Sequence, residues 1–221
     1  MTINYNPRIV TDGLVLALDA GNLKSYPGTG TTWTNLSRRG NNGTLTNGPT
    51  YSSSNGGSIV FDGVDDYANC GTVSDYTFGT GQFSIDIWFK RNGTQGSFAS
   101  VISSSGGTDW QLEPDPLKFK GNSTTYDFNN ATIPNLTWAN VVIVREGTGT
   151  NQTKFYYNSL LDSTHTISDN FAQGQLKIGV NRGTISYFNG NISISRLYVG
   201  KALTAAEVQQ NFNALRGRYG I

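Results

Sequence analysis

The stretch Phe-Ser-Ile-Asp-Ile-Trp-Phe-Lys, residues 83–90, decides the fold class because apolar and polar side chains alternate along it. Successive side chains of a β-strand point to opposite faces of a sheet, so this alternation predicts a half-buried strand. Trp88 shares the polar face and is expected either to line a concave face or to be covered by a loop or the C-terminal helix. Residues 138–144, Trp-Ala-Asn-Val-Val-Ile-Val, are apolar on both faces and predict a strand in the middle of a sheet.

Further runs rich in β-branched and aromatic residues recur on both sides of this stretch, separated by Gly, Asn, Asp and Ser. This spacing is typical of an all-β sandwich. The Asp62–Gly63 dipeptide lies between two of the runs and predicts a hairpin turn. The other strands are expected at residues 14–19, 58–61, 67–70, 97–103, 110–112, 117–119, 154–157, 177–179 and 192–199.

The C-terminal segment differs from the rest because its apolar residues have helical spacing. Thr204 and Glu207 have the spacing of a capping box, in which each side chain bonds the backbone N–H of the other residue. Val208, Phe212 and Leu215 follow at helical intervals and form one apolar face. We therefore expect one short amphipathic helix, ended by Gly217, that packs on the sandwich.

Composition limits the classes of function. The 221 residues include 27 Gly and 6 Pro, and only 14% are charged, against roughly 25% in most soluble domains. A net charge of +1 without a block of Lys or Arg argues against nucleic-acid binding. The apolar runs are too short for a membrane-spanning helix, so membrane insertion is not expected either. The surface is expected to be polar, weakly charged and suited to neutral partners.

Cysteine and histidine are scarce. With one cysteine, Cys70, and one histidine, His165, neither an intrachain disulfide nor a multi-histidine metal site is expected. A catalytic Cys–His pair is the alternative to a structural thiol and a loop histidine. Residues 1–8 lack the pattern of a signal peptide, and we expect folding in a cytosol.

The order of the segments resembles the concanavalin A-like, laminin-G-like jelly roll. The resemblance implies an all-β sandwich of two antiparallel sheets, one of them concave, with one short C-terminal amphipathic helix. It implies a single domain over residues 12–221, preceded by an arm of residues 1–11 that would anchor the protein. It rests on residues 13–19, 33–37, 41–45, 59–67, 83–90, 138–142, 155–158, 188–192 and 196–208.

This type of domain also resembles parts of tailed-bacteriophage virion proteins, which implies assembly into particles in a bacterial cytoplasm. The expected partners are other virion proteins and host-surface glycans, with many copies or a homo-oligomer in the particle. The expected function is a non-enzymatic structural or decorating protein that binds carbohydrate. Two alternatives are a purely architectural capsid or tail protein and a glycan depolymerase.

Sugar binding needs an aromatic face for the C–H side of a pyranose and polar groups for its hydroxyls. The family binds glycans at the concave face or the loop rim. Trp110 beside Asp109 is the expected exposed aromatic, with Tyr126 and Tyr187 as its neighbours. Trp33 is expected to pack a loop against the sandwich.

Catalytic and metal sites have weaker support. Related glucanases use a Glu-x-Asp-x-x-Glu strand, whereas here Glu113 begins a Glu-Pro-Asp segment without a second glutamate, expected at a rim loop or edge turn. We therefore expect no catalytic residues and no cofactor. Asp62, Asp65 and Asp66 are the calcium candidates, and the alternative is that these aspartates shape a turn. Many relatives carry two aspartates in the closing strand, where this chain has Ser193 and Ile194.

Overall fold

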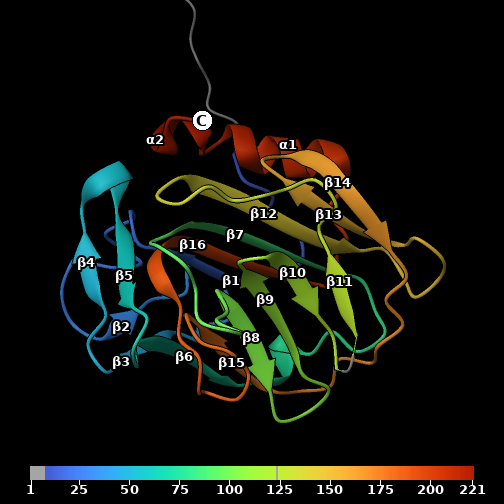
Figure 1. Ribbon diagram of the computed structural model, residues 1–221, viewed down its shortest axis with the longest axis horizontal. Coiled ribbons are helices and arrows are strands. Elements are labelled where there is room, and N and C mark those ends of the chain that lie inside the picture. Colours follow the sequence, from blue (N-terminus) through green and yellow to red (C-terminus); the bar gives the residue numbers. More distant parts are fainter. Residues whose placement is uncertain (1–7, 123) are drawn as a thin grey trace, which may run out of the picture.

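Two antiparallel sheets pack face to face in the computed structural model, which describes residues 8–122 and 124–221 (Figure 1). The expected all-β sandwich is confirmed. In spatial order, sheet A consists of β14 (Leu160–His165), β13 (Thr153–Tyr157), β12 (Trp138–Arg145), β7 (Phe83–Arg91), β16 (Asn189–Val199), β5 (Ser58–Asp62) and β4 (Thr50–Ser52), with β1 (Leu14–Asp19) also paired to β16. Sheet B consists of β11 (Thr125–Asp127), β10 (Leu117–Lys120), β9 (Trp110–Pro114), β8 (Ile102–Ser105), β15 (Gln175–Ile178), β6 (Tyr67–Thr72), β3 (Gly43–Thr46) and β2 (Thr32–Trp33).

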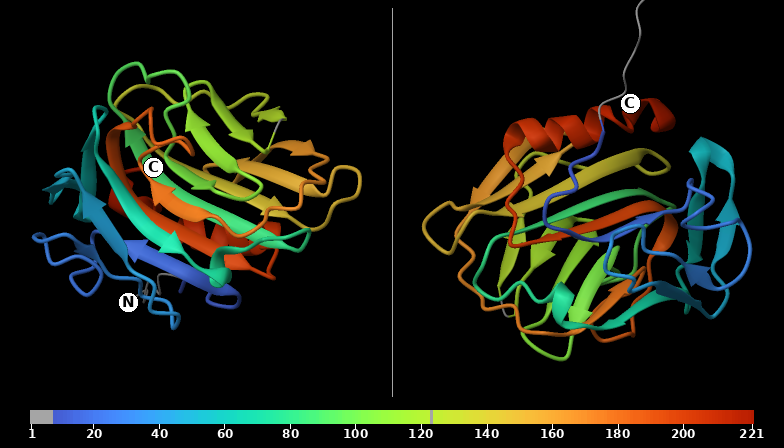
Figure 2. Two further views of the ribbon diagram at one scale, coloured as in Figure 1. Left: turned by 90° about the horizontal axis from the view of Figure 1, so that it is seen from below. Right: turned by 180° about the vertical axis from the view of Figure 1, so that it is seen from behind.

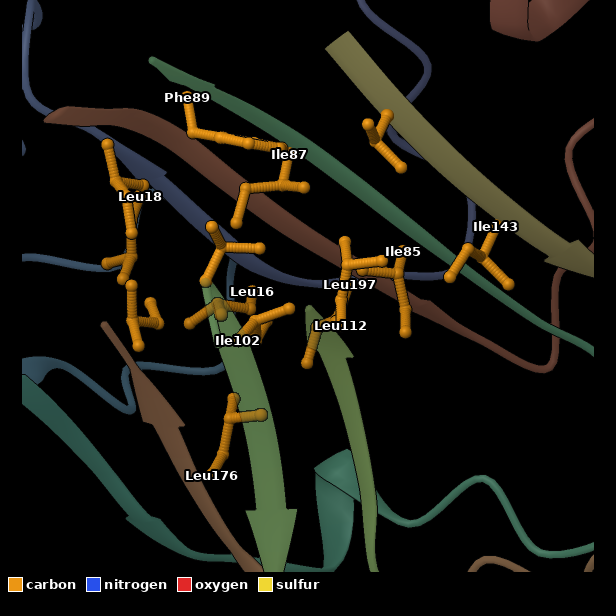
Figure 3. Close-up of a cluster of buried hydrophobic side chains, with 14 of the residues drawn as sticks. Leu16, Leu18, Ile85, Ile87, Phe89, Ile102, Leu112, Ile143, Leu176 and Leu197 are labelled. Carbon is orange, nitrogen blue, oxygen red and sulfur yellow. The ribbon is translucent and has the colours of Figure 1, made fainter. Parts of the chain in front are cut away.

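The core fills the space between the sheets. Figure 3 shows aliphatic side chains of β1 and β7 directed toward those of β8, β9 and β15. Each such side chain contributes about 1.5 to 3 kcal/mol when it leaves water. Trp33 is fully buried in this core, and it lies in the short strand β2 of sheet B and not in a loop. Two single-turn 3₁₀ helices, η1 (Ser54–Gly56) and η2 (Ser74–Tyr76), lie in connections between strands.

The hairpin predicted at Asp62–Gly63 is wrong. β5 belongs to sheet A, where it pairs with β16 and β4, whereas β6 belongs to sheet B, where it pairs with β15 and β3. Gly63 has a φ of 81°, so it does make a tight turn. The same turn residues serve a corner between two sheets as well as a hairpin, and their identity does not distinguish the two.

Two C-terminal helices cover the outer face of sheet A (Figure 2). They are α1 (Ala205–Asn213) and α2 (Arg216–Tyr219), and the predicted capping box of Thr204 and Glu207 is present. The prediction that Gly217 ends the helix is wrong, because Gly217 lies within α2. The residue that caps the end of α2 is Gly220, which has a φ of 74°. Among the described residues, no helix is long and apolar enough to cross a membrane.

These helices overturn the prediction that β7 is half-buried. Residues 83–89 are all buried, because the polar face of the strand lies beneath α1 and α2. Trp88 stacks on Phe212 and Tyr219 with ring centroids 5.5 and 4.3 Å apart. Of the two interpretations of Trp88, coverage by the C-terminal helices is therefore correct. β12 lies between β13 and β7 and is buried along its whole length, as predicted.

Candidate functional site

In the part of the chain that the structure describes, neither α1 nor α2 packs on the outer face of sheet B, and we call this surface the open face. The strand register places polar side chains of five neighbouring strands in one row across it. Side chains of adjacent residues such as Leu112 and Phe119 point the other way, into the core, because strand side chains alternate. From β10 to β6, the row consists of Lys120, Gln111, Ser103, Lys177 and Asn69.

Two loops pack on the open face and are held by this row. Gln111 Nε2 donates to Phe98 O at 3.5 Å, in the loop between β7 and β8. The Oε1 atom of Gln111 accepts from the backbone N of Arg182, 3.4 Å away in the loop between β15 and β16. The loops also meet directly, since Ser186 Oγ donates to Ser97 O at 2.6 Å. One buried amide therefore joins two loops that are far apart in the sequence.

Glu113 lies in a strand on the open face, so the rim loop or edge turn that its prolines indicated is wrong. It is part of β9, between β8 and β10, and its exposed fraction is 2%. Its Oε1 atom accepts from Gln111 Nε2 at 2.6 Å and lies 3.5 Å from Lys120 Nζ, while Oε2 lies 3.3 Å from Lys118 Nζ. Both carboxylate oxygens therefore have partners within the protein.

Phe98 is the exposed aromatic residue of this face, and the sequence analysis missed it. Its exposed fraction is 52%, its φ is 66°, and Lys120 Nζ lies 4.2 Å from the centre of its ring. A bulky side chain rarely takes a left-handed conformation, which costs about 1 to 2 kcal/mol. The strand predicted at residues 97–103 is wrong over its first half, because β8 begins at Ile102 and Phe98 belongs to the preceding loop. Gly96 and Ser97, which are residues typical of loops, directly precede Phe98 and could have indicated that it lies in a loop.

Trp110 is not exposed, contrary to expectation. Its exposed fraction is 1%, and its ring packs against Phe78 and Phe119 with centroids 5.3 and 6.0 Å apart. Trp110 has the parity of Leu112 and therefore faces the core, whereas Gln111 and Glu113 have the outward parity. It cannot serve as a sugar platform in this structure.

Two of the other expected residues, Asp109 and Tyr187, lie around Lys177. Lys177 Nζ donates to Thr184 Oγ1 at 2.5 Å, and Tyr187 OH donates to the backbone oxygen of the same threonine at 3.0 Å. Burial lowers the pKa of Lys177, and the charge of nearby Asp109 partly opposes this shift. Asp109 and Tyr187 are both partly exposed. They lie beside the open face and stay candidates for sugar binding.

Tyr126 lies apart from this group. In β11 it pairs with Phe119, which places it on the core-facing side of the edge strand. Its hydroxyl lies 3.4 Å from Asp169, and its ring packs edge-on against His165 at 5.7 Å. Burial and the charge of Asp169 raise its pKa. The structure therefore does not bring Tyr126 together with the other candidates.

Cys70 and His165 occupy different sheets. Cys70 lies in β6 of sheet B, where burial raises the pKa of the thiol to about 12 and leaves it unreactive. His165 lies in β14 of sheet A, and its Nε2 is 2.9 Å from the backbone oxygen of Asp127. This arrangement supports a structural thiol over a catalytic pair.

The three acidic candidates for calcium do come together. Single carboxylate oxygens of Asp62, Asp65 and Asp66 lie within 4.8 Å of one another. Asp62 Oδ1 accepts from the backbone N of Val64 at 2.8 Å, and Asp66 Oδ2 accepts from the backbone N of Asp62 at 3.1 Å. Burial and the two neighbouring carboxylates raise the pKa of Asp66. These contacts describe a turn, and calcium binding stays a prediction.

A surface hollow of about 710 Å³ lies elsewhere, at the start of β1. Asp12, Leu36 and Arg39 are among the residues that line it, and none of the described residues in its lining is aromatic. A sugar ring needs such a side chain for its apolar side. The open face is shallow, but Phe98 provides such an aromatic side chain there.

Comparison with solved structures finds the same fold in carbohydrate-active proteins and toxins. Domain 4 of AbnA, an extracellular arabinanase from Geobacillus stearothermophilus solved with arabinotriose, is 20% identical, with a TM-score of 0.71 over 90% of this chain and 97% of that one. A Trypanosoma rangeli sialidase in complex with sialic acid is 13% identical (TM-score 0.68, 97% of this chain). The binding domain of Paraclostridial Mosquitocidal Protein 1 is 14% identical (TM-score 0.67, 91% of this chain).

The chain spans 36% of the sialidase and 52% of the mosquitocidal binding domain, so in both cases it corresponds to one part of a larger chain. At these identities the likeness establishes the fold alone. No curated protein sequence matches the chain. Residues 61–209, more than half of the sequence, match the family described as the concanavalin A-like lectin/glucanases superfamily. This match, together with the two-sheet sandwich, shows that the chain belongs to the concanavalin A-like lectin/glucanases superfamily.

Proposed function

We propose that the protein binds carbohydrate without cleaving it, on the open face of sheet B, as a structural or decorating component of a bacteriophage particle. The observation that carries the proposal is Phe98, a half-exposed aromatic ring held in a left-handed conformation beside charged and amide groups. Strained residues of this kind persist where the surrounding structure holds them, and they concentrate at binding sites.

The chemistry of the open face suits a saccharide. The ring of Phe98 offers an apolar surface to the C–H side of a sugar, and Lys120 offers a donor next to it. Asp109 and Tyr187 supply further polar groups around Lys177. Domain 4 of the arabinanase, which has this fold, was solved with arabinotriose. Fold alone does not fix function, so the argument rests on the side chains.

The arrangement around Glu113 supports a non-enzymatic function. A retaining glycosidase needs two carboxyl groups about 5 to 5.5 Å apart, one on each side of the bond to be cleaved. Glu113 instead contacts two lysines and an amide. If the purified protein released reducing ends from a polysaccharide, and Glu113→Gln abolished the release, the depolymerase alternative would be correct.

The sharpest test of sugar binding compares Phe98→Ala with Leu160→Ala. Both side chains are largely exposed, but Leu160 lies in β14 of sheet A, away from the open face. On a glycan array, the parent and Leu160→Ala should bind the same saccharides, and Phe98→Ala should lose about tenfold or more in affinity. Equal binding by all three proteins would remove Phe98 from the site.

The place in a particle needs its own experiment. Shallow sites bind single sugars weakly, and many copies on one particle would provide avidity. Mass spectrometry and antibody labelling of purified particles should find the protein in many copies on the outside. If it is present but neither it nor the particle binds glycans, the purely architectural alternative holds.

The expected N-terminal arm is testable in the same particles. Residues 1–7 lie outside the described residues, while Val10 contacts Asn211 and Tyr198. Incorporation at the parent level of a protein lacking residues 1–11, the whole expected arm, would refute anchoring by this arm.

A further inference from the structure

We propose that the open face binds a saccharide carrying negatively charged groups, with Lys120, Lys177 and Arg182 as the cationic contacts. This inference deepens the carbohydrate-binding function proposed above and rests on it. It concerns the class of sugar, and it departs from the neutral partners that the low charge of the sequence indicated.

Lys177 is the first reason, because it is a buried cation with neutral partners. Its exposed fraction is 7%, and its Nζ donates to Thr184 Oγ1 at 2.5 Å and to Ser105 Oγ at 3.4 Å. Among the described residues, no carboxylate oxygen lies within 4.0 Å of its Nζ, and the charge of Asp109 acts on it only from farther away. Lysine is almost never buried unless it is paired with an acid. An anionic group in direct contact with Nζ would add a negative charge closer than that of Asp109.

Lys120 is the second reason, because it shares its acid with another lysine. Lys118 and Lys120 both contact Glu113, so one carboxylate faces two ammonium groups. Lys120 also lies over the half-exposed ring of Phe98. A sugar that packs on this ring would bring a substituent within reach of an ammonium group that is only partly neutralised.

Arg182 is the third reason. Its Nη1 donates to the backbone oxygens of Gly121 and Asn122 at 3.2 Å, directly after Lys120 in the sequence. In the part of the chain that the structure describes, its guanidinium has carbonyl partners rather than a carboxylate. Guanidinium groups bind carboxylate and sulfate-like oxygens with two parallel hydrogen bonds.

The three cations stand out because the net charge of the whole chain is only +1. Lys120 and Lys177 belong to one transverse row, separated by Gln111 and Ser103. Three strand spacings of about 4.8 Å place them roughly 14 Å apart. Arg182 lies in the loop between β15 and β16. Its backbone N–H donates to Gln111 Oε1, and Gln111 lies between Lys120 and Lys177 in the row. This spacing suits an oligosaccharide with repeated charges better than a single small anion.

The first experiment measures affinity by isothermal titration calorimetry, with polygalacturonate and its carboxyl-reduced form as matched probes. Dextran sulfate tests whether sulfate replaces carboxylate, and dextran and a single-stranded oligonucleotide complete the set. We expect at least one charged saccharide to bind about tenfold more tightly than its neutral counterpart, because charge-assisted contacts contribute on that scale. The difference should shrink between 50 and 200 mM salt.

The variant Lys120→Gln/Arg182→Gln should lose about tenfold in affinity for the charged probe. Its matched control is Lys24→Gln/Arg216→Gln, which removes the same charge from two exposed positions elsewhere and should bind like the parent. Lys177→Gln should weaken binding as well, and a thermal melt shows whether it remains folded. If Lys177→Gln does not fold, the double variant still decides the question.

Three results separate failure of this inference from failure of the proposed function. Equal affinity for charged and neutral saccharides, lost in Phe98→Ala, overturns the inference and leaves carbohydrate binding intact. Tighter binding of the oligonucleotide than of every saccharide overturns both. Equal loss in the double variant and its control shows that net charge alone attracts the probe and also overturns the inference.

Discussion

The outer faces of the two sheets both carry buried charged residues, but the partners of these residues differ between the two faces. On sheet A, Asp86 accepts from Arg196 at 3.1 Å, Asn140 at 2.8 Å and Asn211 at 3.3 Å, and α1 covers the group. On sheet B, Lys177 has hydroxyl partners, and two lysines share Glu113. On sheet A the charged groups are paired with one another beneath a helix, whereas on sheet B two lysines share one carboxylate, which is the difference on which the proposed cationic site rests.

The largest expected effect is on the covered face. Asp86→Ala would leave Arg196 buried without its carboxylate and should lower the free energy of unfolding by about 3 to 5 kcal/mol. Urea denaturation measures the change. The control is Glu146→Ala, which removes an exposed partner of Lys154 and should cost less than about 1 kcal/mol. Similar losses in the two variants would mean that the pairing on sheet A does not contribute as argued.

Glu113→Gln should affect both stability and binding on the open face. Removing the charge between Lys118 and Lys120 should lower the free energy of unfolding by about 1 to 2 kcal/mol. The loss should be smaller than for a fully buried pair, because the two lysines keep access to water. The spare positive charge should raise affinity for polygalacturonate by about fivefold. Calorimetry and denaturation on one preparation test both, and a loss of affinity would contradict the cationic site.

Thr204→Ala should weaken the cover of sheet A and leave sheet B unchanged. It removes the acceptor of the Glu207 N–H in the capping box and should lower stability by about 1 kcal/mol. Thermal unfolding measures this loss, and saccharide affinity should stay at the parent value. A parallel loss of affinity would show that the two faces are coupled through the core.

The smallest expected effect on stability is that of Phe98→Gly. Glycine relieves the left-handed conformation, worth about 1 to 2 kcal/mol, but it loses side-chain packing and gains freedom in the unfolded chain. These changes nearly cancel, so stability should stay within about 0.5 kcal/mol of the parent. Glycan binding should nevertheless be lost. A stable variant that binds normally would argue that Phe98 only shapes its loop.

Local sequence patterns predicted the long strands such as β1, β7, β12 and β16, because alternation and apolar runs are properties of the strand itself, but β2, β3, β4, β11 and β14 were not among the predicted strands. They failed where the answer depends on a distant element. The alternating polar residues of β7 indicated that one side of this strand is exposed to solvent, but α1 and α2 cover that side. Trp110 could have been assigned correctly, since it shares the parity of Leu112 while Gln111 and Glu113 point outward.

The site was predictable only in part. Asp109 and Tyr187 were identified because they are polar or aromatic residues in loop-like sequence, and the structure places them at the open face. Phe98 was not identified, because its exposure depends on a loop held by Gln111 and Ser186. Those contacts join residues far apart in the sequence, and no local pattern reports them.

The pairing of β1 with β16 has a consequence for the timing of folding. The first strand of sheet A finds its partner in the last one, so that Leu14 lies opposite Tyr198. Closing so long a loop has an entropic cost that must be met before the contacts form, which slows folding. During synthesis β1 must wait until nearly the whole domain has left the ribosome, and its apolar side chains need protection until then.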